Sequence, residues 1–201
     1  YFGLNIPISP SGASQRYPDL TIDESGNIHV VWVAISGSSK NVIYSLSEDN
    51  GATFIDAIQI NYFNNHVEAF AGAGPRIRTR GDEVFIIWAD SREGYSNTSI
   101  YMSRSGNGGI TWEEEWKVSD QPHFQLYNDL EIDELGKMHL LYYNFDAGLG
   151  FSNVRYSSTE PGGVEFSTSS TIGVTDEDQE PCDCCAPDMD VNNNGDVYIA
   201  Y

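Results

Sequence analysis

The chain has 201 residues, of which 40% are hydrophobic and 12% aromatic, a composition that supports a packed globular core. Thirty acidic residues stand against ten basic ones, and the net charge of −20 disfavours nucleic acid and anionic membranes as partners. No run approaches the roughly 18 consecutive apolar residues of a membrane span, so the sequence predicts no transmembrane helix.

One segment recurs four times along the chain, starting at Pro18, Pro75, Asn128 and Pro187. The starts lie 57, 53 and 59 residues apart, slightly more than the roughly 40–50 residues of common propeller repeats. Each copy has two short β-rich runs around a turn of Asp, Asn and Gly residues, which is typical of a β-hairpin.

A third β-rich run follows each of the first three hairpins, at 41–47, 99–105 and 153–158, and a fourth follows at 57–61 and 115–119. Four antiparallel strands per repeat are typical of a propeller blade, and no segment shows helical periodicity. The sequence therefore predicts an all-β protein, one β-propeller portion spanning 1–201.

The turn between the third and fourth runs carries a serine, an acid or amide, a glycine, a threonine and an aromatic residue at fixed spacing. The two copies are Ser47, Asp49, Gly51, Thr53 and Phe54, and Ser105, Asn107, Gly109, Thr111 and Trp112. This pattern resembles the Asp box, or bacterial neuraminidase repeat, of the sialidase superfamily. The resemblance implies that each turn joins the two outer strands of a propeller blade.

The ends of the chain suggest an incomplete propeller. Residues 4–9 match the fourth strand of a preceding blade, and the last repeat stops after its second strand. About three and a half blades are therefore expected. If the propeller follows the sialidases it has six blades, and the rest of it would come from the same longer chain.

Blade topology places the hairpin turns and the Asp boxes at one end and the longer, more varied loops at the other, where function concentrates. Asp90 and Arg92 lie in these loops, and we interpret them either as a catalytic acid/base or sugar clamp, or as a pair that holds the turn. Four further loop residues are candidate ligands: His66, Glu68, His123 and Asp146. His29 and His139, in contrast, occupy matching strand positions and are predicted to pack between blades.

A cysteine cluster is the least generic feature of the sequence: Cys182, Cys184 and Cys185. It predicts either disulfide pairing in an oxidising compartment, including pairing to a cysteine elsewhere, or a thiolate metal site. Residues 190–196 resemble the start of an EF-hand, although its twelfth position is Tyr201 rather than glutamate. Calcium or a thiolate-bound metal are thus the cofactors that the sequence suggests.

Two functions follow from these observations. The first is a secreted, periplasmic or cell-surface propeller that binds a glycan or a surface protein through loop aromatics, namely Tyr62, Phe63, Phe70, Tyr95, Phe124, Tyr127 and Phe151. The alternative is an exo-acting glycoside hydrolase whose remaining catalytic residues lie beyond Tyr201. Residues 74–78 depart from the arginine motif of sialidases, because Pro75 precedes Arg76 instead of following an arginine.

Overall fold

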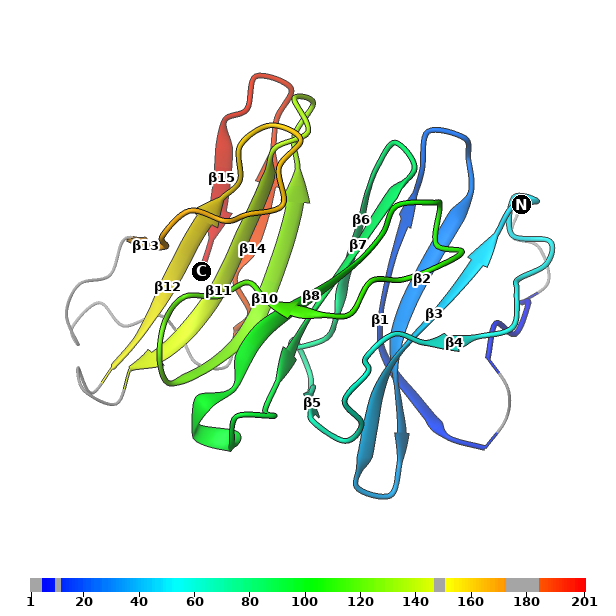
Figure 1. Ribbon diagram of the computed structural model, residues 1–201, viewed down its shortest axis with the longest axis horizontal. Helices are drawn as coiled ribbons and strands as arrows, with labels where there is room; N and C mark the ends of the chain where they lie inside the picture. The colour runs from blue at the N-terminus through cyan, green and yellow to red at the C-terminus, as the bar shows by residue number, and fades with distance from the viewer. Residues whose placement is uncertain (1–4, 10–11, 147–150, 173–184) are drawn as a thin grey trace.

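A computed structural model describes residues 5–9, 12–146, 151–172 and 185–201, and it has the predicted all-β architecture of propeller blades standing side by side (Figure 1). Blade 1 consists of β1 (Ser14–Ile22), β2 (Ile28–Ser36), β3 (Ser39–Ser47) and β4 (Ile58–Gln59). Blade 2 consists of β5 (Val67–Glu68), β6 (Arg76–Arg80), β7 (Glu83–Asp90), β8 (Ser99–Ser105) and β9 (Trp116–Lys117). Blade 3 consists of β10 (Phe124–Ile132), β11 (Met138–Asp146), β12 (Phe151–Ser158) and β13 (Ser170–Ile172), and a half-blade of β14 (Asp188–Val191) and β15 (Val197–Ala200) follows.

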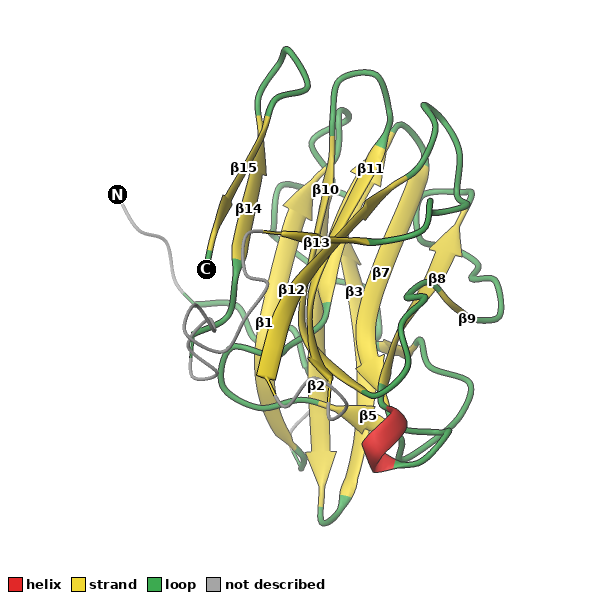
Figure 2. Ribbon diagram, turned by 90° about the vertical axis from the view of Figure 1, so that its left-hand side faces the viewer, coloured by secondary structure: helices red, strands yellow, loops and turns green. Residues whose placement is uncertain are grey.

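All strand pairs within the blades are antiparallel, and the third and fourth strands fall where the repeats predict them. The turns between the first and second strands gather at one end of the blades with the turns after β3 and β8, which we call the turn end. The connections between second and third strands and between blades lie at the other, the loop end, which is the lower end in Figure 1. The segment 34–41 was expected to be a long loop there, but β2 and β3 are joined by a tight turn at Gly37 and Ser38. A short 3₁₀ turn, η1 (Tyr95–Asn97), lies at the loop end, as Figure 2 shows. Among the described residues, no helix has the length and apolar character needed to cross a bilayer.

One further sequence prediction needs correction and another stays a prediction. Residues 5–9 pair with no strand among the described residues, and the strands of a preceding blade would lie before residue 1, so their assignment to such a blade is not tested. Glu68 was expected in a loop, yet it lies in β5, which pairs with the end of β7. The inner strand of blade 2 is thus split in two by residues 69–75, whereas blades 1 and 3 have only a register shift at this point.

The hydrophobic core consists of the layers between adjacent blades. Val31, Val33 and Tyr44 of blade 1 pack against Ile86 and Trp88 of blade 2. On the other side of blade 2, aliphatic residues of β7 pack against β10 and β11, and Met189 of the half-blade joins the same cluster. Successive side chains along each central strand therefore serve two different interfaces, as the pleat of a β-strand requires.

The two turns that follow β3 and β8 share one hydrogen-bond pattern. Ser47 Oγ accepts the N–H of Gly51 at 2.8 Å, and Asp49 accepts the N–H and the hydroxyl of Thr53 at 2.8 and 2.6 Å. These bonds, led by the Thr53 hydroxyl, lower the pKa of Asp49 to about 2. In the second turn Ser105 Oγ accepts the N–H of Gly109 and Asn107 Oδ1 accepts the N–H of Thr111, while the Asn107 amide donates to the Thr111 hydroxyl. The serine and the acid or amide at these positions thus satisfy the backbone of a tight turn.

The second turn also closes the interface between blades 1 and 2. Gly109 adopts a φ of +89°, and a Cβ built on it would lie 2.0 Å from the hydroxyl oxygen of Tyr44. The Trp112 ring packs edge-on against Tyr44, with centroids 5.0 Å apart. The absence of a side chain at Gly109 is therefore required by both the backbone and the neighbouring blade.

We expect Gly109→Ala to lower the free energy of unfolding by about 2–4 kcal/mol, because it combines left-handed backbone strain with a clash against a buried ring. Gly106→Ala in the same turn is the matched control, since no atom lies within 4 Å of its Cβ position and its φ is not left-handed. Urea unfolding of both variants measures the difference. Equal stability of the two variants would contradict this account of the interface.

Candidate functional site

The Asp90–Arg92 pair lies at the loop end of blade 2, where β7 ends in a turn. The guanidinium of Arg92 donates from Nε to Asp90 Oδ1 at 2.9 Å and from Nη2 to Asp90 Oδ2 at 2.8 Å. The backbone N–H of Arg92 and the indole N–H of Trp88 also donate to this carboxylate. Both oxygens of the buried Asp90 are thus occupied by four hydrogen bonds, which leaves the carboxylate poorly placed to transfer a proton.

Glu115 completes this cluster, and the sequence analysis did not identify it. Arg92 Nη2 donates to Glu115 Oε1 at 2.8 Å, and the backbone N–H groups of Tyr62 and Phe63 donate to the same carboxylate. Glu115 is separated from Arg92 by 23 residues and is the third of three consecutive glutamates, so no local spacing distinguishes it. The one sequence feature that could have pointed to Glu115 is its position directly before Trp116, the first residue of β9.

Two aromatic rings enclose the guanidinium of Arg92. Its Cζ lies 4.5 Å from the ring centroid of Phe63 in blade 1 and 4.0 Å from that of Tyr101 in blade 2. Burial alone would lower the pKa of Arg92, but the hydrogen bonds and charges of Asp90 and Glu115 raise it above its usual value. The cluster therefore holds the loop after β4 against blade 2, and its arginine stays positively charged.

Two of the other predicted site residues, His66 and Glu68, lie beside Asp90, and the other two lie in blade 3. His66 accepts the N–H of Ser91 through its carbonyl oxygen at 2.7 Å, and Glu68 accepts the Ser91 hydroxyl at 2.9 Å while pairing with Lys40. His123 precedes β10 in blade 3 and has a φ of +78°. Asp146 is the last residue of β11, and its side chain lies outside the described residues.

The predicted metal sites receive no support from the described ranges. Cys182 and Cys184 lie outside the described residues, whereas Cys185 is exposed, so the disulfide stays a prediction. Residues 192–196 form a hairpin turn in which Asn192 Oδ1 accepts the N–H groups of Asn194 and Asp196. Within the described ranges, no three His, Cys, Asp or Glu side chains form a cluster able to hold a metal ion.

The inner strands carry a second charged cluster, which the sequence analysis did not single out. Arg78 pairs with Asp19 of blade 1 and with Glu131 of blade 3, both at hydrogen-bond distance. Arg76 Nε lies 3.4 Å from Asp129 Oδ1. Burial raises the pKa of Asp129 to about 6, although both arginines act to lower it.

His29 and His139 are buried between blades, as the sequence predicted, and each belongs to a hydrogen-bonded chain. His29 Nδ1 lies 2.8 Å from the Tyr44 hydroxyl, and its Nε2 lies 3.3 Å from Asp23 Oδ2. His139, Tyr156 and Asp133 repeat this arrangement in blade 3. Burial lowers the pKa of both imidazoles, and the two aspartates offset this only in part.

Comparisons with known proteins identify the fold. No family model and no curated protein matches the sequence. Among solved structures, the chain is similar to the α-L-arabinanase of Penicillium chrysogenum complexed with arabinobiose, at 14% identity and a TM-score of 0.63, over 95% of this chain and 59% of that one. It is also similar to the GH93 α-L-arabinofuranosidase of Fusarium graminearum, at 13% identity and a TM-score of 0.62, over 92% and 58% of the two chains. An ulvan lyase of polysaccharide lyase family PL25 matches at 12% identity and a TM-score of 0.56, over 87% and 46%. The chain thus spans about half the length of these carbohydrate-active β-propellers, and at this identity the likeness establishes the fold.

We expect Arg92→Lys to lower the free energy of unfolding by about 2–4 kcal/mol, because lysine cannot replace the forked contacts and leaves two buried carboxylates poorly paired. Arg104→Lys is the matched control. Arg104 pairs with Glu83 and Glu113 but is far more exposed, so we expect a loss of at most about 1 kcal/mol. Thermal and urea unfolding measure the stability of both variants. An Arg92→Lys variant as stable as the wild type would contradict the stabilising role of this cluster.

We also expect the two buried histidines to make stability depend on pH. In the unfolded chain their pKa is about 6.5, so below that pH the unfolded chain binds more protons and the free energy of unfolding falls. Asp129 acts in the opposite direction, because its folded pKa of about 6 lies above the unfolded value and stabilises the fold as pH drops. A His29→Phe, His139→Phe double variant isolates the histidines, since Phe85 occupies the equivalent position in blade 2.

Urea unfolding of the wild type and the double variant between pH 7.5 and 5 measures this effect. The wild type should lose more stability over this range than the variant. Parallel pH profiles would show that the imidazoles do not titrate differently in the folded and unfolded chains.

Proposed function

We propose that the protein is a carbohydrate-binding propeller that recognises its ligand at the loop end of the blades. One observation carries this proposal. The exposed large apolar side chains differ between the two ends: the turn end carries the aliphatic residues Ile55, Ile110 and Leu135, and the loop end carries aromatic ones, namely Tyr62, Phe63, Phe70 and Tyr95. Exposed tyrosine and phenylalanine rings present flat apolar faces that suit the C–H faces of sugars, and the tyrosine hydroxyl groups can form hydrogen bonds with sugar hydroxyl groups.

The aromatic residues of the loop end form two groups. Tyr62 and Phe63 stack edge-on with centroids 5.4 Å apart, above the Arg92 cluster. Tyr95 contacts Phe124 with centroids 4.8 Å apart, and Phe124 contacts Phe145 at 5.4 Å. From Phe145 a further series of rings leads inward through Tyr143 and Tyr127 to Phe70. The exposed rings are thus supported from below by buried ones, which keeps them in place for binding.

Charge favours a neutral glycan over an acidic one. The chain carries a net charge of −20, which repels uronic acids and sulfated sugars. Seven of the ten basic side chains already form ion pairs with carboxylates: Lys40, Arg76, Arg78, Arg80, Arg92, Arg104 and Lys117. A ligand carboxylate or sulfate would therefore have to compete with these internal partners.

The similar structures are those of carbohydrate-active proteins, which supports a carbohydrate as the ligand. They include an arabinanase and an arabinofuranosidase, both complexed with the neutral sugar arabinobiose, whereas the ulvan lyase is described with an acidic, sulfated saccharide. We propose binding rather than turnover, because both oxygens of Asp90 are committed to internal hydrogen bonds. The serine–acid–threonine bonds of the two turns support assigning them as Asp boxes of a sialidase-like propeller, and we place the protein outside the cytoplasm on this basis.

We expect Tyr62→Ala and Tyr95→Ala each to weaken binding of a neutral oligosaccharide by about tenfold, since one stacked ring contributes roughly 1–2 kcal/mol. Isothermal titration calorimetry with an arabinan- and glucan-derived panel gives the affinities, and sulfated and uronic oligosaccharides are the charged comparison. Tyr198→Ala removes an exposed tyrosine from β15 and is the matched control.

Binding of none of the neutral sugars, or equal loss in the Tyr198 control, would contradict the proposal. Release of monosaccharide during the titration, detected by chromatography, would instead support an exo-acting glycoside hydrolase.

A further inference from the structure

Two strongly exposed aromatic rings lie at the loop end of blade 2, the blade that stands between blades 1 and 3. Tyr62 is 71% exposed and lies in the loop between β4 and β5. Tyr95 is 65% exposed and is the first residue of η1, in the loop between β7 and β8. Rings this open offer their faces to a ligand without enclosing it. They are therefore flat contact surfaces rather than the walls of a pocket.

Backbone hydrogen bonds fix the position of both rings. The N–H of Tyr62 donates to the two oxygens of the buried Glu115 at 3.1 and 3.0 Å. The carbonyl of Tyr95 accepts the N–H of Thr98 at 3.2 Å and its hydroxyl at 2.7 Å. The carbonyl of Thr98 in turn accepts the N–H of Gln125 in blade 3 at 2.9 Å. The spacing of the two rings is thus set before a ligand binds, which reduces the entropic cost of binding.

A continuous series of contacts joins the two rings. Tyr62 packs edge-on against Phe63, whose ring centroid lies 4.5 Å from Cζ of Arg92. Arg92 precedes Tyr95 by three residues, so the Cα atoms of this pair are at most about 11 Å apart. The two exposed rings therefore lie within reach of one short oligosaccharide.

An exposed ion pair lies along this series, between the two rings. Glu93 Oε1 accepts the hydroxyl of Tyr101 at 3.5 Å, and Glu93 Oε2 lies 3.4 Å from Lys117 Nζ. The ring of Tyr101 also packs on the guanidinium of Arg92, with Cζ 4.0 Å from its centroid. Sugar hydroxyl groups can donate to the carboxylate and accept from the ammonium group. The surface between the rings therefore suits the polar edge of a neutral sugar chain.

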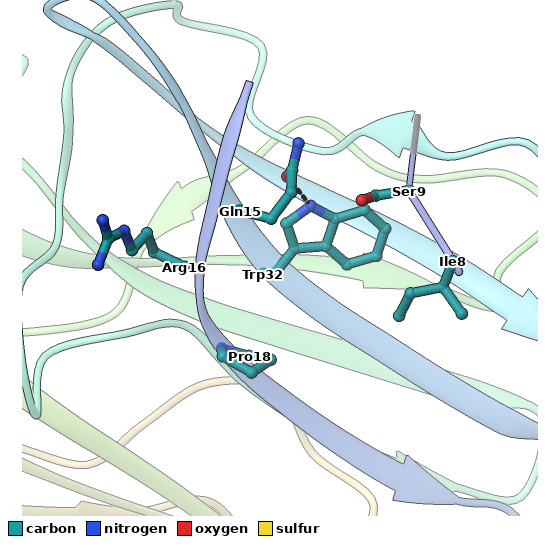
Figure 3. Close-up of a pocket in the computed structure, with 6 residues that line it drawn as sticks. All are labelled: Ile8, Ser9, Gln15, Arg16, Pro18 and Trp32. Carbon is teal, nitrogen blue, oxygen red and sulfur yellow. Dashed lines mark hydrogen bonds between the residues drawn. The ribbon is translucent and has the colours of Figure 1, made fainter. Parts of the chain in front are cut away.

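A pocket in blade 1 also combines an aromatic ring with polar side chains, but it does not suit a sugar. It is lined by Ile8, Ser9, Gln15, Arg16, Pro18 and Trp32 (Figure 3). Its volume of about 110 Å³ is below the roughly 300–1,000 Å³ of ligand pockets. Trp32 is only 3% exposed, and its indole N–H donates to Gln15, so neither a ring face nor a donor is free for a ligand.

We propose that one linear chain of neutral sugars lies across the loop end of blade 2. Tyr62 stacks on one sugar unit, Tyr95 stacks on another, and Glu93 and Lys117 bind hydroxyl groups between them. This inference rests on the proposed carbohydrate binding and adds that both rings act on a single ligand. Because neither ring encloses the end of a chain, the site recognises an internal run of a polymer.

Isothermal titration calorimetry with neutral di-, tetra- and hexasaccharides tests the inference. We expect one hexasaccharide per protein, bound at least about tenfold more tightly than the disaccharide, because only a longer chain reaches both rings. Tyr62→Ala and Tyr95→Ala should each remove this gain with length. The double variant should weaken hexasaccharide binding by about a hundredfold, since effects at separated positions add.

Lys117→Met tests the contacts between the rings, because it keeps the length of the side chain and removes its hydrogen-bond donors. It should weaken hexasaccharide binding by about threefold to tenfold. Glu48→Gln alters an exposed carboxylate at the turn end and should leave binding unchanged. Circular dichroism checks that each variant is folded. Unchanged hexasaccharide binding by Lys117→Met would overturn the placement of the chain over this ion pair.

A hexasaccharide with a bulky fluorophore on its reducing end should bind as tightly as the unlabelled one, because the chain ends lie beyond both rings. Loss of binding on labelling would show recognition of a chain end and would overturn the inference. Two hexasaccharides per protein, one of them lost in each tyrosine variant, would show two independent sites; this result overturns the inference but leaves the proposed function intact. Absence of binding to every neutral sugar would contradict the proposed function itself.

Discussion

The structure depends on the way in which each blade binds the backbone of the next one. A blade is a small antiparallel sheet, and its outermost strand, β4, β9 or β13, has only two or three residues. Such a sheet has little stability alone, so its two apolar faces must be covered by its neighbours. The carboxylates of Asp19 and Asp129 add direction to this packing, because each binds one particular N–H of the following inner strand. Hydrophobic contact brings the blades together, and these bonds set their register.

Much of this architecture could be predicted from the sequence, because the repeats carry it locally. Alternating apolar residues and Asp/Asn/Gly turns define each hairpin, and Ser47 and Ser105 with their partners define the outer turns. The split inner strand of blade 2 could not be predicted, since Val67 and Glu68 pair with β7 only after the 69–75 segment folds back. The assignment of 4–9 to a preceding blade stays a prediction, because its pattern suits a strand but the partner strand would lie before residue 1.

The candidate site could also be predicted only in part from the sequence. The proximity of Asp90 and Arg92 follows from their spacing, and the sequence analysis weighed a structural role for the pair. Their dependence on Glu115 and Phe63 could not be predicted, since Glu115 is brought to Arg92 by the fold of blade 2 and Phe63 by the loop that leads into it from blade 1. Asp90 and Glu115 are buried, whereas the neighbouring aromatic residues Tyr62 and Phe63 are exposed. The polar cluster holds two blades together, and the aromatic residues that it supports are accessible to a ligand.

The replacement of an aspartate by Arg76 in the second repeat has a mechanical consequence. Without that aspartate, the N–H of Leu130 is bound by Asp129 of its own strand. Blades 2 and 3 meet instead through ion pairs of Arg76 and Arg78 and through bonds from Arg80 to backbone carbonyls of blade 3. Ion pairs between flexible side chains tolerate small rotations and weaken as salt increases, whereas a carboxylate bound to a backbone N–H does not slide. Rotation between blades 2 and 3 is therefore resisted by the shared hydrophobic core and by arginine contacts, some of them ion pairs that salt weakens, rather than by an aspartate bound to the next strand's backbone.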